Sequence, residues 1–259
     1  MIKQDQNQIF INADDFGYHE SVNQAIYRSF KLGLIQSTSM LVNMLGFDDA
    51  VRIFLFDPIL SDKVGLHINL TEGYPLSNPI KSCPRFCDES GNFIYKREQP
   101  LFFLSKQEKT AIYQEISEQI EKLRTAGIQP AHIDSHHHIH TEWPVFKIAL
   151  HLAKQYGIQK IRIARNLGRQ DHFIKKQYRN VLNIYLKYFG GRANSDFFGD
   201  LDDFAASSQI KHEKNKLIEI MVHPKLNSVQ EIIDYNGNLL KDRLLVIIPE
   251  FNIEPHRSS

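Results

Sequence analysis

The sequence has few cysteines, no long apolar run and no excess of charge of either sign. Its two cysteines, Cys83 and Cys87, are too few for a disulfide-stabilised scaffold or a zinc site of four thiolates. Lys and Arg number 31 against 30 Asp and Glu, so the formal net charge of +1 offers no basic surface for nucleic acid. No apolar stretch approaches the ~20 residues of a membrane span, and the first ten residues lack the apolar region of a signal peptide. We therefore expect a cytoplasmic protein that binds neither nucleic acid nor membrane.

The chain is long enough for one sizeable α/β domain, with 259 residues of which 42% are hydrophobic. Short apolar runs alternate with amphipathic stretches along it. The runs expected to form strands are 8–12, 37–43, 64–70, 131–134, 158–164 and 217–222, with 244–248 as a further candidate. The stretches expected to form helices are 19–32, 47–56, 105–126, 144–156 and 171–189. This alternation predicts parallel β-α-β units in a single domain, and both a (β/α) barrel and an open doubly wound sheet fit it.

Residues 71–104 break the alternation, because they contain four prolines and no regular period. A segment this long inside a compact domain is typical of a lid or a binding loop. We expect its aromatic side chains mostly to pack within the segment itself. They are Tyr74, Phe86, Phe93, Tyr95 and Phe102.

Polar side chains follow four of the expected strands. In parallel α/β folds such positions meet at one edge of the sheet, where catalytic groups gather. The residues in question are Asp14, Asp15, His67, Asp134, His136, His137, His138, His140 and His223. Four segments far apart in the sequence would therefore contribute to one polar rim.

The densest part of this rim is the stretch HIDSHHHIH at 132–140. Neutral imidazole and carboxylate are good ligands for divalent transition metals, and histidine also transfers protons near neutral pH. Asp134 and His136 fall on the same side of an extended segment, so we expect one of them to orient or supplement the other. The spacing is not that of a helical H-E-x-x-H site, and a solvated loop without metal is the alternative.

The other rim positions are weaker signals when taken singly. A lone histidine such as His67 or His223 is more often a satisfied structural residue than a ligand. Asp14 and Asp15 form either a simple turn or a divided pair, in which one carboxylate binds metal and the other accepts a proton. Neither a phosphate-binding glycine loop nor a G-x-S-x-G nucleophile turn occurs in the sequence.

Several motifs, taken together and in order, resemble those of the YdjC-like carbohydrate deacetylases. They are NADDFG at 12–17, STS at 37–39 with Asn43, GLHINLT at 65–71, the stretch at 132–140 and VHP at 222–224. The resemblance spans about residues 8–224. It implies a single-domain (β/α) barrel-like fold over 1–259, with residues 71–104 as a lid-like insertion.

The resemblance also implies an activity and a site. Family members are metal-dependent hydrolases that release acetate from N-acetylated sugars such as chito-oligosaccharides. Carried over to this sequence, the metal ligands would be Asp15, His67 and His136. Asp14 would be the general base and His223 the general acid, while Arg162 would orient the base.

The metal and the C-terminal part are less well defined. The resemblance implies Mg²⁺, whereas a nitrogen-rich ligand set chemically favours Zn²⁺, Co²⁺ or Ni²⁺. Residues 236–250 look more like a strand than like the helix that the family carries there, so we expect an irregular C-terminus. A homodimer is compatible with the sequence but not indicated by it.

Other functions stay open at this point. Two histidines and one carboxylate also describe non-haem Fe(II) oxygenases, although their usual fold is all-β. A metal-dependent phosphoesterase or sugar isomerase could use the same rim. A carbohydrate-binding barrel without catalysis is the non-enzymatic alternative.

Overall fold

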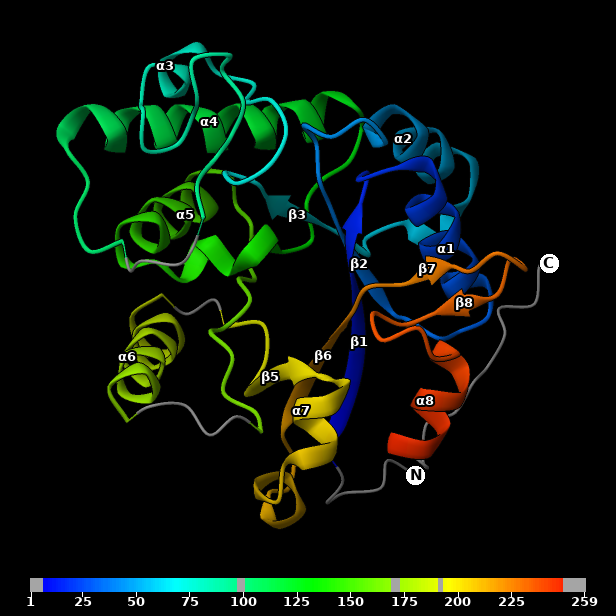
Figure 1. Ribbon diagram of the computed structural model, residues 1–259. Coiled ribbons are helices and arrows are strands. Elements are labelled where there is room, and N and C mark those ends of the chain that lie inside the picture. The colour runs from blue at the N-terminus through cyan, green and yellow to red at the C-terminus, as the bar shows by residue number, and fades with distance from the viewer. Residues whose placement is uncertain (1–6, 97–100, 169–172, 191–192, 249–259) are drawn as a thin grey trace.

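The computed structural model describes residues 7–96, 101–168, 173–190 and 193–248. Its centre is a curled sheet of six parallel strands in the order β4-β3-β2-β1-β6-β5 (Figure 1). The strands are β1 (Gln8–Phe16), β2 (Ser37–Met40), β3 (Val64–Ile68), β4 (Ile133–Ser135), β5 (Phe197–Asp200) and β6 (Leu217–Val222). The sheet forms a half-barrel, which confirms the predicted single-domain, barrel-like α/β fold.

Helices pack around the outside of this curl (Figure 1). They are α1 (Glu20–Lys31), α2 (Phe47–Phe56), α3 (Asn78–Lys81), α4 (Lys106–Thr125), α5 (Trp143–Gln155), α6 (Phe173–Ile184), α7 (Leu201–Ala206) and α8 (Leu240–Ile247). Short helical turns are η1 (Pro58–Leu60), η2 (His136–Thr141), η3 (Tyr185–Gly190) and η4 (Gln209–His212). A capping box begins α4, since the side chains of Ser105 and Glu108 each bond the other's backbone. None of the helices within the described part of the chain is long and apolar enough to cross a membrane.

The polar interior of the curl follows from strand register. Residues paired across parallel strands point to the same face. Asn12 pairs with Ser37, and His67 pairs with Asp134. A bridge between Ile133 and Ile161 continues the pairing of the backbone beyond β4. The next residues along the two segments, Asp134 and Arg162, are therefore neighbours inside the curl. Apolar side chains fill the opposite face and pack against the helices.

Two expected strands differ in the structure. The run 158–164 contributes only single bridges at Ile161, to Ile133 and to Ala193. The run 244–248 is not a strand: α8 occupies Leu240–Ile247, and its buried Leu240 and Leu244 are spaced for one helix face. A short apolar run cannot distinguish strand from helix by its period, so the prediction of a strand in this run was wrong. After β6, the chain also makes a small hairpin of β7 (Lys225–Leu226) and β8 (Ile232–Ile233).

The sequence reading also missed β5, which has four residues including Gly199 and therefore shows no clear period. The expected helix at 171–189 begins outside the described residues, and within them it is α6 followed by the π-turn η3.

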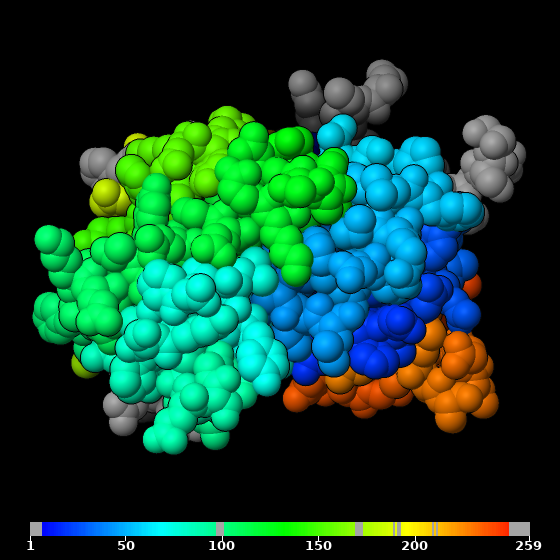
Figure 2. Space-filling view, turned by 90° about the horizontal axis from the view of Figure 1, so that it is seen from above, coloured from blue at the N-terminus to red at the C-terminus, as the bar shows by residue number. Residues whose placement is uncertain are grey.

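The segment at 71–104 is described except for 97–100. Phe86, Phe93 and Tyr95 are buried, and the rings of Phe86 and Tyr95 stack at 5.3 Å between centroids. Glu115 of α4 accepts hydrogen bonds from the backbone at Leu76 and Ser77. Figure 2 shows this segment, in cyan, lying beside the green of α4 and α5. It therefore packs on α4, and its role as a lid stays a prediction.

Candidate active site

Asp14 and Asp15 lie near the carboxyl end of β1, where the strand is irregular. The register with β2 shifts between Ala13 and Phe16, and Asp15 has a φ of +74°. Bulges of this kind redirect side chains. Asp14 is buried inside the curl, whereas the side chain of Asp15 is 19% exposed at its rim. Two adjacent carboxylates thus have different surroundings, as a division of labour requires.

The three predicted metal ligands converge at this rim. Oδ1 of Asp15 lies 3.3 Å from Nε2 of His67 and 2.9 Å from Nδ1 of His136. The two imidazole rings are 5.7 Å apart between centroids. Burial alone would raise the pKa of Asp15, but the two histidines together lower it well below its usual range. Residues from β1, β3 and the turn after β4 are therefore brought together, while their role as ligands stays a prediction.

These side chains fit a divalent cation. Their ligand atoms all lie within 4.8 Å of one another. Among the residues that the structure describes, no partner bonds the buried Oδ1 of Asp15 in normal geometry, despite two imidazole nitrogens close by. A buried acceptor left unsatisfied costs free energy. One carboxylate with two imidazoles is also a set that first-row divalent ions accept.

His67 is held by a carboxylate on its far nitrogen. Its Nδ1 lies 2.7 Å from Oδ1 of Asp134 and 3.1 Å from Oγ of Ser39. An imidazole that donates from Nδ1 presents its Nε2 to a metal. Burial would lower the pKa of His67, but Asp134 outweighs it and the pKa rises to about 10.

The expectation that Asp134 and His136 form an orienting pair was wrong. Asp134 pairs in register with His67 and so faces it across the sheet. Asp134 lies 2.7 Å from Nδ1 of His67, whereas the ring nitrogens of His136 lie near Asp15 and Glu72 at the rim. Alternation along one segment could not reveal which neighbouring strand supplies the partner.

Arg162 lies fully buried at the centre of the curl. Its Nη1 and Nη2 donate to the two oxygens of Asp14, each at 2.7 Å. Nη1 is also 2.7 Å from Oδ2 of Asp134, and Nε donates to Oε1 of Glu219 at 2.6 Å. One guanidinium thus holds three buried carboxylates in fixed positions.

The carboxylates around Arg162 differ in their electrostatics. Burial would raise the pKa of Asp134, but Arg162 and His67 lower it far below its usual range. For Glu219 burial dominates and raises the pKa, although Arg162 opposes it. Asn194 donates to the second oxygen of Glu219 at 2.9 Å. Sequence reasoning missed Glu219, and its signal was a single charge inside the apolar strand LIEIMV.

Glu72 is a second rim residue that sequence reasoning missed. Its Oε1 lies 3.5 Å from Nε2 of His136 and 3.7 Å from Nε2 of His137. Tyr18 donates to its other oxygen at 3.1 Å. Glu72 therefore faces the metal-ligand candidates from the start of the 71–104 segment, and a polar residue two positions after Leu70 was the only signal.

The remaining histidines of the tract have structural contacts. His140 lies 2.5 Å from Oγ of Ser135 and 3.1 Å from the carbonyl oxygen of Arg162. His132 packs over Gly65, where an added Cβ would lie 2.4 Å from the imidazole Nε2. Burial lowers the pKa of His132 to about 4, against the opposing charge of Asp134.

His223 follows β6 at the same edge. Ala13 pairs with Val222, so His223 and Asp14 occupy corresponding positions at the ends of adjacent strands. Within the described ranges, no hydrogen bond or ion pair joins His223 to Asp14 or to the three metal-ligand candidates. His223 instead lines a neighbouring pocket and lies beside Tyr235, with 6.5 Å between ring centroids.

A comparison with known families finds a match to the model of the YdjC-like protein over residues 8–245. The chain belongs to the YdjC-like family. The resemblance seen in the sequence motifs is thereby confirmed.

Curated relatives of this YdjC-like protein cover most of its length. A carbohydrate deacetylase of Oceanobacillus iheyensis is 31% identical over 242 residues, which are 91% of this chain and 92% of that protein. A carbohydrate deacetylase of Geobacillus stearothermophilus is 36% identical over 216 residues, covering 83% of this chain and 78% of the relative.

A solved structure shares the fold. It is a protein of Enterococcus faecalis described as a cellobiose-phosphate cleavage protein, with a TM-score of 0.68 and 25% sequence identity. The match covers 94% of this chain and 90% of that one.

Proposed function

We propose that this YdjC-like protein is a metal-dependent hydrolase that releases acetate from N-acetylated sugars, such as chito-oligosaccharides. The observation that carries the proposal is the convergence of Asp15, His67 and His136 around an unsatisfied carboxylate oxygen, next to the buried pair of Asp14 and Arg162. The names of the curated relatives support the reaction and the substrate class.

The metal-ligand candidates would hold the ion in a defined way. Asp15 supplies charge, and His67 is fixed by Asp134 so that its Nε2 faces Asp15. A divalent ion bound there supplies Lewis acidity, which polarises an acetyl carbonyl and acidifies a water. The donor set suits a transition ion such as Zn²⁺, and the family resemblance favours Mg²⁺.

Asp14 is placed to act as general base. Arg162 and Asn12 donate to its carboxylate, which orients it while leaving acceptor capacity on its oxygens. In this proposal Asp14 takes the proton of the attacking water. Acid–base help of this type typically contributes about 10²–10⁴-fold to the rate.

His223 is proposed to protonate the departing nitrogen. It stands at the end of β6, in the position that corresponds to Asp14 on β1. Base and acid would then flank the substrate from adjacent strands. Glu72 lies at the rim close to His136 and His137.

Acetate release tests the reaction directly. We expect the protein to release acetate from N-acetylglucosamine oligomers, to lose this activity after chelation and to regain it when a divalent ion is added. Phosphate release from sugar phosphates without acetate release would instead support the phosphoesterase alternative. Iron-dependent oxygen consumption would support an oxygenase.

Metal stoichiometry tests the ligand set. We expect His136→Ala to bind less than one ion per chain under conditions that saturate the wild type. The matched control is His151→Ala on the exposed face of α5, which should keep full stoichiometry. Full occupancy in His136→Ala would contradict the assignment.

A further inference from the structure

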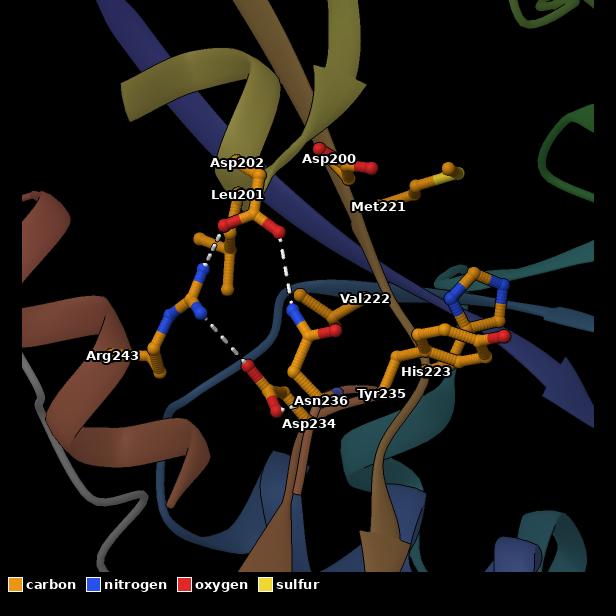
Figure 3. A pocket seen from close by; sticks show the side chains of 10 residues that line it. All are labelled: Asp200, Leu201, Asp202, Met221, Val222, His223, Asp234, Tyr235, Asn236 and Arg243. Carbon is orange, nitrogen blue, oxygen red and sulfur yellow. Dashed lines mark hydrogen bonds and ion pairs between the residues drawn. The ribbon is translucent and has the colours of Figure 1, made fainter. Parts of the chain in front are cut away.

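A pocket of about 320 Å³ opens beside His223, between the ends of β5 and β6 and the turn that follows β8 (Figure 3). Its volume falls in the range of small-ligand sites, ~300–1,000 Å³. Its lining combines aromatic, apolar and acidic side chains, among them Tyr235, Met221, Asp200, Asp202 and Asp234. The pocket is not part of the ligand cluster described above.

The pocket lies on the same edge of the sheet as the metal-ligand candidates. Asp200 ends β5 and Val222 ends β6, and β6 pairs directly with β1, which carries Asp15. A substrate whose amide lies over the rim can therefore reach the pocket with its neighbouring atoms. His223 lines the pocket, so the proposed acid stands at the boundary between the two.

Tyr235 gives the pocket an aromatic wall. The residue is 77% exposed, although large aromatic side chains are usually covered. Its ring meets His223 at an interplanar angle of 64°, and Nζ of Lys225 lies 5.6 Å from its centroid. Aromatic rings combine apolar contact area with low conformational entropy, and small-ligand sites use them as platforms.

The turn that carries Tyr235 is held rigidly. Oδ1 of Asp234 accepts from the backbone N–H of Asn236 at 2.8 Å and of Asn238 at 2.9 Å. Arg243 of α8 bridges Asp202 at 2.5 Å and Asp234 at 3.5 Å. Figure 3 shows this bridge on one side of the pocket and the Tyr235 and His223 rings on the other. A pre-positioned ring loses little entropy when a ligand stacks on it.

The polar groups of the pocket suit hydroxyl groups. Three carboxylates and one guanidinium line it. Each carboxylate is paired with an arginine, Asp200 with Arg165 and both Asp202 and Asp234 with Arg243, so their charges are compensated. The remaining lone pairs of these carboxylates accept hydrogen bonds from hydroxyl groups. An aromatic ring beside such acceptors matches a pyranose. The C–H groups on the face of the sugar ring can stack on the aromatic ring, and the hydroxyl groups at its edge can donate to the carboxylates.

We propose that this pocket binds a pyranose unit of the substrate, stacked on Tyr235 beside the unit that loses its acetyl group. The inference rests on the proposed deacetylase function and names the part of the site that selects the sugar. Tyr235 is then a specificity residue. It takes no part in proton transfer.

Binding and kinetics of a Tyr235 series test the proposal. For the N-acetylglucosamine trimer, we expect Tyr235→Ala to raise both the Kd of the metal-free protein and the KM of the loaded enzyme about 5- to 20-fold. Tyr235→Phe should stay within about twofold of wild type, because stacking needs the ring and not the hydroxyl. Tyr188→Ala, which removes an exposed ring elsewhere, is the matched control and should change nothing.

The outcomes separate this inference from the proposed function. If the wild type releases acetate but Tyr235→Ala binds and turns over the trimer normally, the pocket assignment fails and the deacetylase function stands. If the trimer binds with the expected dependence on Tyr235 but no acetate is released, the proposed deacetylase function is contradicted and the assignment of the pocket as a sugar site is supported.

Discussion

Arg162 and Arg243 both bridge carboxylates at this edge of the sheet, but their surroundings differ. Arg162 has no exposed side-chain surface and joins Asp14 to Asp134 and Glu219, which are also buried. The side chain of Arg243 is 20% exposed, and that of its partner Asp202 is 63% exposed. Arginine–carboxylate bridges thus occur both in the interior, at Arg162, and near the surface, between Arg243 and the exposed Asp202.

The difference in burial indicates what each set of ion pairs contributes to the protein. In the interior, the charges have no water to replace a lost partner, so each one depends on the others for its charged state and position. At the surface, water screens the ion pair, and water can solvate either charge at a small cost in free energy when its partner is removed. The buried cluster fixes Asp14, the proposed base, whereas the bridge from Arg243 only holds a turn in place.

Replacing the buried arginine should have the largest effect. Arg162→Met would leave three carboxylates close together without a counter-charge. We expect the free energy of unfolding to fall by about 3–5 kcal/mol and activity to be lost, because Asp14 would no longer be oriented. Urea denaturation followed by circular dichroism measures the first effect, and acetate release the second.

A second substitution sharpens this result. Adding Glu219→Gln to Arg162→Met removes one of the stranded charges, so part of the lost stability should return. If the double variant is no more stable than Arg162→Met alone, repulsion among the carboxylates is not the cause.

Neutralising the base should separate catalysis from structure. Asp14→Asn keeps an oxygen that accepts from Arg162 but cannot take a proton at neutral pH. We expect kcat to fall by about 10²–10⁴-fold, with metal stoichiometry unchanged. Asp48→Asn, on the exposed side of α2, is the control. Turnover near the wild-type rate would remove Asp14 from the role of base.

Much of the fold could be predicted because β1, β3 and β6 contain apolar runs bounded by turn residues. The C-terminal part could not be predicted in this way. The run around Leu244 has no period of its own, and only packing of Leu240 and Leu244 makes it a helix. Four-residue β5 is stabilised by its pairing with β6, which no local pattern reveals.

The candidate site also has one part that could be predicted from the sequence and one that could not. Asp15, His67 and His136 could be proposed from motifs because each lies near or just after the carboxyl end of a recognisable strand. The partners that hold them could not: Asp134 faces His67 through sheet register, and Glu219 reaches Arg162 from another strand. Such pairings depend on the three-dimensional curl of the sheet.

A pH titration extends the comparison to a neutral buried group. His132 has a pKa of about 4, lowered by burial, while in the unfolded chain it would titrate near 6.5. Between these values the unfolded state binds the additional proton, so stability should fall as the pH falls from 6.5 to 4, by about 3 kcal/mol in total. Above pH 6.5 this contribution should be complete and constant.

Comparing slopes isolates the contribution of His132. In His132→Gln the pH dependence of the unfolding free energy should be shallower by up to about 1.4 kcal/mol per pH unit in that window. His151→Gln, at an exposed position, should keep the wild-type slope. Equal slopes in wild type and His132→Gln would mean that the native state protonates His132 as readily as the unfolded chain does.

The surface arginine should show the smallest effect. Arg243→Met removes the bridge between Asp202 and Asp234, but Asp234 keeps its bonds to the backbone of Asn236 and Asn238. Since the pair is screened, we expect a loss below about 1 kcal/mol in the same urea titration. High salt should reduce this difference further, whereas it should barely change the effect of Arg162→Met. If Arg243→Met proved as destabilising as Arg162→Met, burial would not be what distinguishes the two arginines.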